Sequence, residues 1–346
     1  MSEAWLIGTL AFALAAGLTA WIRRVAIRLQ MIDRPNERSS HVTPTPRGGG
    51  LAIVVTTIAA VLWLVAEARL DPRLGGVLVA GGGLVAGVGF LDDRYGLSPG
   101  VRLVAHVTAA VMASWTVGGL PAIPWAAQLV DPGFTGLLVA TVGLVWALNL
   151  FNFMDGIDGI AGSEAAFVGV TGSILSLCFG GSDGIALVAM VLGGASIGFL
   201  WWNWPPAGIF MGDAGSGFLG FVIGLLALTA AAADGWAVLL SWLVLCGSFL
   251  VDATVTLAVR LARGQKPHLA HRTHTYQKLS IRWQSHSRVT LAYAFVNVAW
   301  LLPWAGMCRL RHDLAPVFAV AALSPLVVVA IVVRAGIPDE SRIALS

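Results

Sequence analysis

Long apolar runs alternate along the chain with short polar stretches rich in Gly, Asn, Asp and Pro. An apolar run of about 20 residues is long enough to cross the hydrocarbon core of a membrane as a helix. Gly and Pro inside several runs are compatible with this, because neighbouring helices can satisfy the freed backbone groups. The pattern predicts eleven membrane-spanning helices, the third short and the ninth long, at residues 3–22, 49–68, 75–91, 101–118, 133–151, 161–180, 184–202, 214–232, 236–260, 288–307 and 313–334.

The composition supports a membrane protein. The chain is 57% hydrophobic and 11% charged, with a mean hydropathy of +0.82. The first apolar run has no basic segment before it and is followed by Arg23 and Arg24, which argues against a cleaved signal peptide. The three cysteines show neither a disulfide pattern nor metal-site spacing. We therefore expect one all-α domain over residues 1–346, a polytopic helix bundle in the membrane.

The distribution of Lys and Arg predicts the orientation. With the N-terminus outside, seventeen of the 21 basic residues fall in inner segments, and four fall outside: Arg69, Arg73, Arg309 and Arg311. Inner loops of membrane proteins carry such an excess of basic residues. The sequence thus predicts an outer N-terminus and a cytoplasmic C-terminus.

Five unusual polar stretches all follow odd-numbered spans, so the same orientation places all five on the cytoplasmic side. They are DRPNERSSHVTPTPRGGG (33–50), LDDRYGLSPGVR (91–102), NLFNFMDGIDG (149–159), NWPPAGIFMGDAGSG (203–217) and KPHLAHRTHTYQKL (266–279). The outer loops carry little comparable chemistry. We expect the functional site at the inner membrane edge, where soluble substrates can reach it.

These stretches combine carboxylates with basic side chains. Five aspartates are flanked there by Gly, Asn or aromatic residues: Asp92, Asp93, Asp155, Asp158 and Asp213. Carboxylates gathered at one site repel one another unless a cation joins them, and Mg²⁺ prefers oxygen ligands together with waters and substrate phosphates. The basic partners on this face are Arg34, Arg38, Arg47, Lys266, Arg272 and three histidines. This combination suits phosphoryl transfer, in which positioning and charge neutralisation provide most of the catalysis.

Each stretch also has a simpler explanation. Asp92 and Asp93 could cap a helix end, and PTPRGGG could be a linker. Asp155 and Asp158 are three apart, which places them on one helix face or, given their glycines, in a turn. The three histidines, His268, His271 and His274, could bind zinc, but their spacing among Lys and Arg favours a basic ladder.

Two further acids stand apart from these stretches. Asp252 lies well inside the ninth apolar run, where an acid is costly and usually faces the bundle interior with a partner. We expect it to make a structural polar contact. Glu164 lies near the start of the sixth run and is interpreted as a boundary charge.

Five motifs in order, TPRGGG, LDDRYGLS, NLFNFMDGIDG, FMGDAGS and HLAHRTHTYQ, resemble the polyprenyl-phosphate N-acetylhexosamine-1-phosphate transferases of glycosyltransferase family 4. The resemblance extends from Asp33 to about Leu279. It implies a bundle of ten or eleven helices in the bacterial inner membrane, with an active-site cleft facing the cytoplasm. The implied reaction transfers a sugar 1-phosphate from a UDP-N-acetylhexosamine to undecaprenyl phosphate, releases UMP and requires Mg²⁺, or Mn²⁺ in its place. No nucleic-acid partner is expected, and a homodimer is left open.

The resemblance also implies roles for matching residues. Asp213 corresponds to a metal ligand, with Asn152 beside it in this role, and Asp92 and Asp93 correspond to paired aspartates near the lipid phosphate. The remaining catalytic expectations are Asp155, Asp158 and His271. Substrate-binding expectations fall on Arg47, Asn149, Asn152, Phe210, Gly212, His268, Arg272 and His274.

The motifs of this chain differ from those of the peptidoglycan branch of that family, and the differences narrow the range of implied sugar substrates. That branch carries lysines after its paired aspartates and a tight run of histidines, whereas Arg94 and Tyr95 follow the aspartates here and the histidines lie three apart. HRTHTYQKL is similar to the subgroup that initiates O-antigen or capsule-type polysaccharides. The sugar stays open among GlcNAc, GalNAc, FucNAc and QuiNAc.

Two other classes of function remain as alternatives. A multi-span transporter of an anionic or nucleotide-sugar substrate would also use polar, glycine-broken segments. Carriers, however, place their sites near the bilayer midplane and often show repeated halves, and neither feature is seen in this sequence. An inactive membrane scaffold with the same fold is disfavoured because no motif position is lost.

Overall fold

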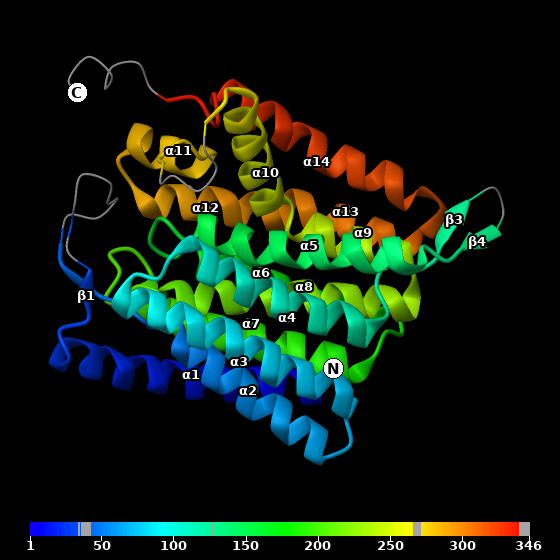
Figure 1. The fold of residues 1–346 in the computed structure, drawn as a ribbon, viewed down its shortest axis with the longest axis horizontal. Coiled ribbons are helices and arrows are strands. Elements are labelled where there is room, and N and C mark those ends of the chain that lie inside the picture. The colour runs from blue at the N-terminus through cyan, green and yellow to red at the C-terminus, as the bar shows by residue number, and fades with distance from the viewer. Residues whose placement is uncertain (34, 36–42, 126–127, 266–270, 339–346) are drawn as a thin grey trace.

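The computed structural model describes residues 1–33, 35, 43–125, 128–265 and 271–338. Most helices run side by side along the long axis of the molecule, whereas α10 lies across it, with β1 at one end and the β3–β4 hairpin at the other (Figure 1). The helices are α1 (Ser2–Arg28), α2 (Leu51–Ala66), α3 (Pro72–Tyr95), α4 (Pro99–Val117), α5 (Gly133–Met154), α6 (Ile160–Cys178), α7 (Asp183–Asn203), α8 (Asp213–Asp234), α9 (Trp236–Leu245), α10 (Gly247–Ala262), α11 (Thr275–Trp283), α12 (His286–Val296), α13 (Leu302–Leu310) and α14 (Ala315–Val332), with a π-helical turn at Asn297–Leu301 and a 3-10 turn at His312–Leu314. Two antiparallel pairs complete the fold: β1 (Ile32–Asp33) with β2 (Thr45–Pro46), and β3 (Ile123–Trp125) with β4 (Gln128–Val130). The predicted all-α polytopic bundle is confirmed.

Nine helices in the described part of the chain are long and apolar enough to cross a membrane, and ten if the bent α9–α10 pair is one span. The second predicted span forms a helix of only 16 residues, α2. The third span was expected to be short, but α3 has 24 residues because the helix continues through Asp92 and Asp93 to Tyr95. The count of eleven spans and the orientation of the termini stay predictions.

The ninth span is the main correction to the expected helices. The run 236–260 was predicted as one long span, but it divides at Cys246 into α9 and α10, which are bent by 80°. Gly247 lies at the bend, and a Cβ there would approach Leu323 Cδ2 to 2.7 Å. Glu164 accepts a hydrogen bond from Ser248 Oγ (3.1 Å) and another from Asn297 Nδ2 (2.5 Å). Glu164 is therefore a buried acceptor at the bend, and its interpretation as a boundary charge was wrong.

Helices α7 and α8 form the centre of the bundle, with 83% and 78% of their apolar windows buried. Small residues permit this close packing, as they do in other membrane helices. A Cβ on Gly169 of α6 would lie 2.6 Å from the backbone nitrogen of Gly193 in α7. Helices α1, α12–α13 and α14 have only 22% of their windows buried, so their apolar side chains form the outer surface.

Candidate active site

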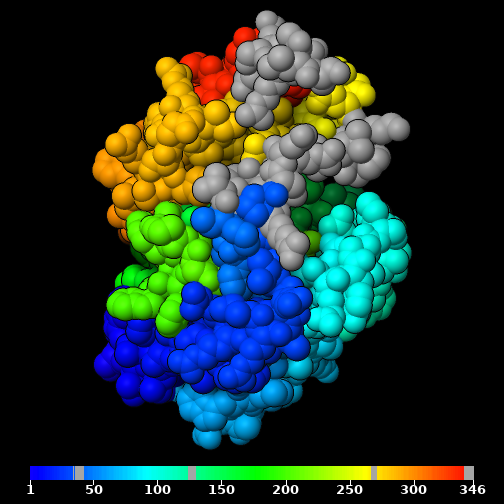
Figure 2. Space-filling view, turned by 90° about the vertical axis from the view of Figure 1, so that its left-hand side faces the viewer, coloured from blue at the N-terminus to red at the C-terminus, as the bar shows by residue number. Residues whose placement is uncertain are grey.

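The site lies at the β1 end of the bundle, where segments far apart in the chain meet. Figure 2 views this end directly: blue, cyan, green and orange segments lie next to one another on one face. The ends of α3 and α8 and the residues after β2 contribute the charged groups described below. The convergence predicted for the motif stretches is therefore present for the parts of them that the structure describes.

The stretch PRGGG is packed against the loop that carries Asp213, so it is not a free linker. Phe210 N donates to Pro46 O (2.8 Å), and Gly48 N and Gly49 N both donate to Phe210 O (3.1 and 2.9 Å). A Cβ on Gly49 would approach Phe199 Cε2 to 2.7 Å. The glycines thus allow the two backbones to approach closely, which places Arg47 beside the start of α8.

Arg47 joins two aspartates at this point. Its Nε lies 2.9 Å from Asp93 Oδ1, and its Nη2 lies 3.0 Å from Asp213 Oδ1. The side chain of Asp93 has no exposed surface and also accepts the backbone N–H groups of Asp213 (3.0 Å) and Ala214 (3.4 Å). Asp93 therefore caps the N-terminus of α8, where a negative charge is favoured by the helix dipole.

Arg102 is a second bridging cation that the sequence interpretation did not single out. Its Nη1 lies 2.8 Å from Asp92 Oδ2 and 3.5 Å from Asp213 Oδ2. Asp92 Oδ1 also accepts Leu97 N at 2.6 Å, which fixes the turn between α3 and α4. The available signal was a lone basic residue in the first turn of α4, soon after the paired aspartates.

The charges in this acidic cluster, defined as Asp92, Asp93, Asp213, Arg47 and Arg102, do not balance, because three carboxylates share two arginines. Burial alone would lower the pKa of Arg47, but the neighbouring Asp93 and Asp213 carboxylates raise it overall, so Arg47 keeps its charge.

Asp155, in the loop between α5 and α6, is subject to the same excess of negative charge. Burial, followed by the charge of Asp213, raises its pKa to about 7. An additional cation at the cluster is therefore electrostatically favoured.

A cavity of about 630 Å³ opens from this cluster. Its polar end is lined by Arg102, Asn149, Asn152, Asp213, His271, His274 and Gln277. Its other walls are apolar and include Leu103 of α4, Val142 of α5 and Leu257 of α10. From Asn152 to Val142 the cavity follows α5 for about 15 Å, and Val142 and Leu103 are exposed on the side of the bundle. The cavity thus joins a charged end to an apolar lateral surface.

A second cavity, of about 580 Å³, adjoins the cluster at Arg47. It is lined by residues 29–33 and by Arg47, Asp93, Arg94 and Tyr95. Arg47 and residues 93–95 border this cavity, whereas Asp213 and Arg102 border the larger one. The acidic cluster therefore adjoins two cavities, although the carboxylate of Asp93 itself is buried.

The histidine motif reaches the larger cavity through the start of α11. The rings of His271 and His274 stack with centroids 4.9 Å apart, and both residues line the cavity. His274 precedes the first residue of α11, and its backbone N–H donates to Gln277 Oε1 (3.2 Å). Arg272 lies between the two histidines in the chain, and His268 lies outside the described residues.

The Asn- and Asp-rich loop is divided between two environments. Asn152 Nδ2 donates to Ser216 Oγ (3.2 Å), so its amide lies beside the first turn of α8, and Asn149 Nδ2 bonds Val145 O (2.7 Å). Asp158 points elsewhere: its Oδ2 accepts Ala207 N (3.1 Å) and lies 3.4 Å from His286 Nδ1. Asn152 therefore lies with the acidic cluster, whereas Asp158 ties the loop to residue 207 and α12.

The two residues expected near the nucleoside lie directly before α8. Phe210 pairs through its backbone with Arg47 and the residues on either side of it. Gly212 has φ +80°, and a Cβ there would collide with the Asp93 carboxylate. Glycine is thus required at this position by both the backbone conformation and the close approach of Asp93.

The oxygen donors at the cluster suit a hard cation. The carboxylate of Asp213 and the amide of Asn152 both face the larger cavity. Within the described residues, no three His, Cys, Asp or Glu side chains form a complete metal cage. A Mg²⁺ site of one or two protein oxygens completed by waters and phosphates does not need such a cage.

The chain is similar to known transferases that act on polyprenyl phosphates. The model of glycosyl transferase family 4 matches residues 76–231. The decaprenyl-phosphate N-acetylglucosaminephosphotransferase of Mycolicibacterium smegmatis is 32% identical over 329 residues, covering 86% of this chain and 80% of the relative. The probable undecaprenyl-phosphate N-acetylglucosaminyl 1-phosphate transferase of Bacillus subtilis is 28% identical over 81% of this chain and 78% of its own. The undecaprenyl-phosphate alpha-N-acetylglucosaminyl 1-phosphate transferase of Yersinia pestis is 29% identical over 87% and 83%, respectively.

Proposed function

Because the chain belongs to glycosyl transferase family 4, we propose that it transfers N-acetylglucosamine 1-phosphate from UDP-N-acetylglucosamine to a polyprenyl phosphate and releases UMP. The choice of GlcNAc rests on the names of the relatives from M. smegmatis, B. subtilis and Y. pestis. The same names include both decaprenyl and undecaprenyl phosphate, and undecaprenyl phosphate is the acceptor we propose. The role we propose is the first membrane step of an O-antigen or capsule-type polysaccharide.

The observation that supports this reaction best is the larger cavity. It joins a charged end, where Asp213 and Arg102 lie, to apolar walls that reach the side of the bundle. A polyprenyl phosphate has the same two parts, a charged head and a long apolar tail. The second cavity at Arg47 leaves space for a separate soluble donor. A transporter would need a pathway through the bundle centre, and there α7 and α8 are tightly packed.

The proposed chemistry is a phosphoryl transfer. An oxygen of the lipid phosphate attacks the β-phosphorus of the UDP-sugar, the bond from this phosphorus to the bridging oxygen breaks, and UMP leaves. The lipid phosphate is already mostly ionised near neutral pH, since the second pKa of a phosphate monoester is about 6. Alignment of the two phosphates is therefore the main task of the protein, and a route through an aspartyl-phosphate remains a second possibility.

The residues of the site divide this task. Asp213 and the amide oxygen of Asn152 would hold Mg²⁺, which supplies neutralisation of the diphosphate charge when bound. Arg47 and Arg102 would exchange their carboxylate partners for phosphate oxygens, which the guanidinium fork fits well. Asp92 would orient the lipid phosphate.

The stacked histidines complete the proposed site. His271, His274 and Arg272 would contact the phosphate that stays with the sugar.

We propose that this site faces the cytoplasm of a bacterial inner membrane. The support is the strong bias of Lys and Arg in the sequence toward the loops that share one side of the predicted spans with the five motifs. A soluble UDP-sugar is made in the cytoplasm, so the donor would reach the cluster from that side.

The test is UMP release by the purified protein in detergent. The reactions would combine Mg²⁺, undecaprenyl or decaprenyl phosphate, and UDP-linked GlcNAc, GalNAc, FucNAc or QuiNAc. We expect UMP only when lipid and divalent cation are both present, with UDP-GlcNAc the best donor. UMP formed without lipid phosphate would indicate a hydrolase, and no UMP with any donor would reject the transferase function.

A further inference from the structure

Asp252 is a buried acid in α10 whose carboxylate is fully engaged. It is 3% exposed. Its Oδ1 accepts Thr275 N (2.8 Å) and Thr256 Oγ1 (3.2 Å), and its Oδ2 accepts Tyr276 N (3.0 Å) and the Tyr293 hydroxyl (2.7 Å). The structural polar contact expected for this acid is therefore present, and its partners show what the contact holds.

Two of these partners are the first backbone N–H groups of α11. The first amides of a helix have no acceptor within the helix itself, and a side chain just before the helix usually serves them. Here the residue before α11 is His274, and its own side chain accepts a hydrogen bond from neither of these two amides. An aspartate from another helix takes that role, and its negative charge also suits a helix N-terminus.

The first turn of α11 is held from other sides as well. The Tyr276 hydroxyl donates to Phe153 O (3.0 Å) at the end of α5, and Gly336 N donates to Thr273 O (2.9 Å). Tyr276 itself is fully buried. Among the contacts described for this turn, only those with Asp252 involve a charged group. Hydrogen bonds to a charged acceptor are stronger than neutral ones.

The start of α11 determines where the histidines point. His274 Nδ1 lies 3.4 Å from Asp252 Oδ1, and its ring stacks on that of His271. Both histidines line the larger cavity together with Asp213, whereas Asp252 is not among its described lining residues. Asp252 can therefore influence the site through the histidines without contacting a ligand.

We propose that Asp252 is a positioning residue, whose carboxylate fixes the first turn of α11 and thereby holds His271 and His274 against the cavity. This inference rests on the proposed function for its catalytic consequence. Its structural part, the anchoring of α11, depends only on the hydrogen bonds of Asp252 described above. Ser248, Asp252 and Thr256, spaced by four, lie on one face of α10. Of these, Thr256 donates to the Asp252 carboxylate and so supports the anchor, whereas Ser248 bonds Glu164.

Hydrogen–deuterium exchange of the purified protein tests the anchor directly. In the unmodified protein, the amides of Thr275 and Tyr276 should exchange at least about tenfold more slowly than those of His286 and Ser287, the corresponding amides of α12. Equal rates would overturn the proposal without any substitution.

Asp252→Asn should then speed exchange at Thr275 and Tyr276 by about tenfold or more, because one amide oxygen cannot replace a carboxylate with two accepting oxygens. Glu164→Gln is the matched control: it makes the same change at a buried carboxylate that bonds Ser248 and Asn297. It should leave exchange at Thr275 and Tyr276 unchanged. A folded Asp252→Asn protein with unchanged exchange there would overturn the anchor.

Kinetics of UMP release separate positioning from a general loss of stability. Asp252→Asn should lower kcat by about 100-fold, as expected for misplaced groups, with a change of less than about threefold in the KM for the donor. Combined with His274→Ala, it should add less than about twofold to the loss caused by His274→Ala alone. If the kcat losses caused by the two single substitutions instead multiply in the double variant, Asp252 does not act through the histidine. If the unmodified protein makes no UMP, the proposed function fails, but the exchange measurements still decide whether Asp252 anchors α11.

Discussion

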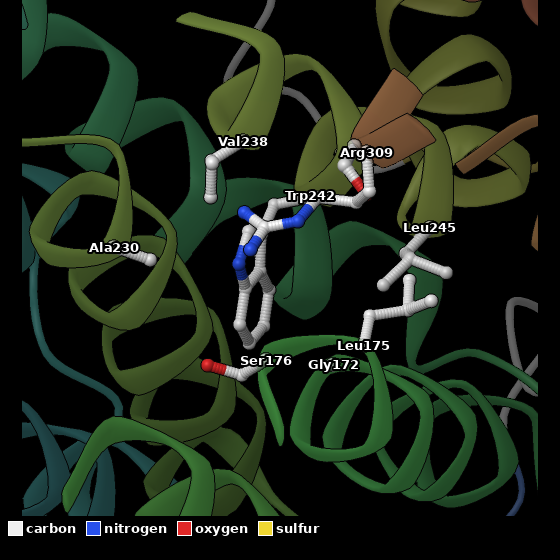
Figure 3. Close-up of a pocket in the computed structure, with 9 residues that line it drawn as sticks. Gly172, Leu175, Ser176, Ala230, Val238, Trp242, Leu245 and Arg309 are labelled. Atoms are coloured by element: carbon white, nitrogen blue, oxygen red, sulfur yellow. The ribbon is translucent and has the colours of Figure 1, made fainter. Parts of the chain in front are cut away.

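Helix α8 carries an aspartate at each end. The two ends differ in the balance of charges around the aspartate and in the volume of the adjoining cavity. Asp213, the first residue, faces Arg47 (3.0 Å) and Arg102 (3.5 Å) beside two further aspartates. Asp234, the last residue, lies 3.9 Å from Arg309. The cavity at Asp213 measures about 630 Å³, whereas the one at Arg309 measures about 10 Å³. Figure 3 shows Arg309, Trp242 and Ser176 around this smaller space, which has room for about one water.

The comparison shows that an ion pair by itself does not indicate a function. At Asp234 one acid and one base compensate each other, and the arginine also offsets a carboxylate placed unfavourably at a helix C-terminus. At Asp213 three carboxylates compete for two arginines at a helix N-terminus, and a large space adjoins them. Excess charge with room for a ligand distinguishes the site, and the following substitutions test this distinction.

The largest expected effect is that of Asp213→Asn. It removes the charge that would hold the metal, so UMP release should fall by about 1,000-fold or more, with the protein still monodisperse in detergent. Asp234→Asn makes the same change at the other end of the helix and should keep activity within about twofold of the unmodified protein. Near-normal turnover by Asp213→Asn would reject it as the metal ligand.

Arg47→Met should have the next largest effect. It leaves the fully buried Asp93 without its cation, so we expect about 100-fold lower activity and a loss of about 2 kcal/mol in the free energy of unfolding. Adding Asp93→Asn should recover part of the stability but not the activity. Arg311→Met, at an exposed pair with Asp313, should change the melting temperature little. Equal destabilisation by the two arginine variants would contradict the distinction between the buried charge pair at the site and an exposed surface pair.

The glycines that flank α8 provide a third matched pair. Gly212 and Gly235 have φ values of +80° and +87°, so an Ala at either position adds backbone strain of about 1 kcal/mol. Only at Gly212 would the new Cβ collide with the Asp93 carboxylate, because nothing lies within 4 Å of the corresponding atom at Gly235. Gly212→Ala should therefore lower activity by about tenfold, whereas Gly235→Ala should lower stability alone. Thermal melting and UMP release, measured together, distinguish the two results.

The smallest expected effect is a pH dependence of stability from Asp155. Its pKa is raised to about 7 in the folded protein by burial and then by the charge of Asp213, against about 3.9 in an unfolded chain. The folded state therefore keeps a proton that the unfolded state has lost. The contribution of Asp155 to the free energy of unfolding is therefore largest below about pH 4. It declines as the pH rises to about 7 and does not change further above that.

Asp155→Asn should remove this decline. In metal-free protein, the melting temperature of the variant relative to the unmodified protein should rise by about 4 °C between pH 4.5 and pH 8. Melting curves in EDTA across this range provide the measurement. A difference between the two proteins that is the same at both pH values would show that Asp155 does not titrate in this interval.

The sequence by itself determined the helix bundle and the gathering of the motifs at one end of it. Apolar runs long enough to cross a membrane were sufficient for the helices, because in lipid a helix satisfies its own backbone groups. The basic bias and the order of the five motifs were sufficient to bring Asp92, Asp93 and Asp213 to one end. These are local or additive properties of the chain, so they can be read without knowing which helices touch.

Tertiary structure decided what depends on partners from elsewhere in the chain. The bend at Cys246 depends on Glu164 and Leu323, and the cluster gains Arg102 because the turn after α3 directs it toward Asp213. Asp158, expected with the other acids, turns instead to Ala207 and His286. Asp252 is an unexplained acid in an apolar run until α11 is placed against it. No local pattern encodes these pairings, since they form only when helix packing brings distant polar groups together, where a polar group removed from water needs a partner.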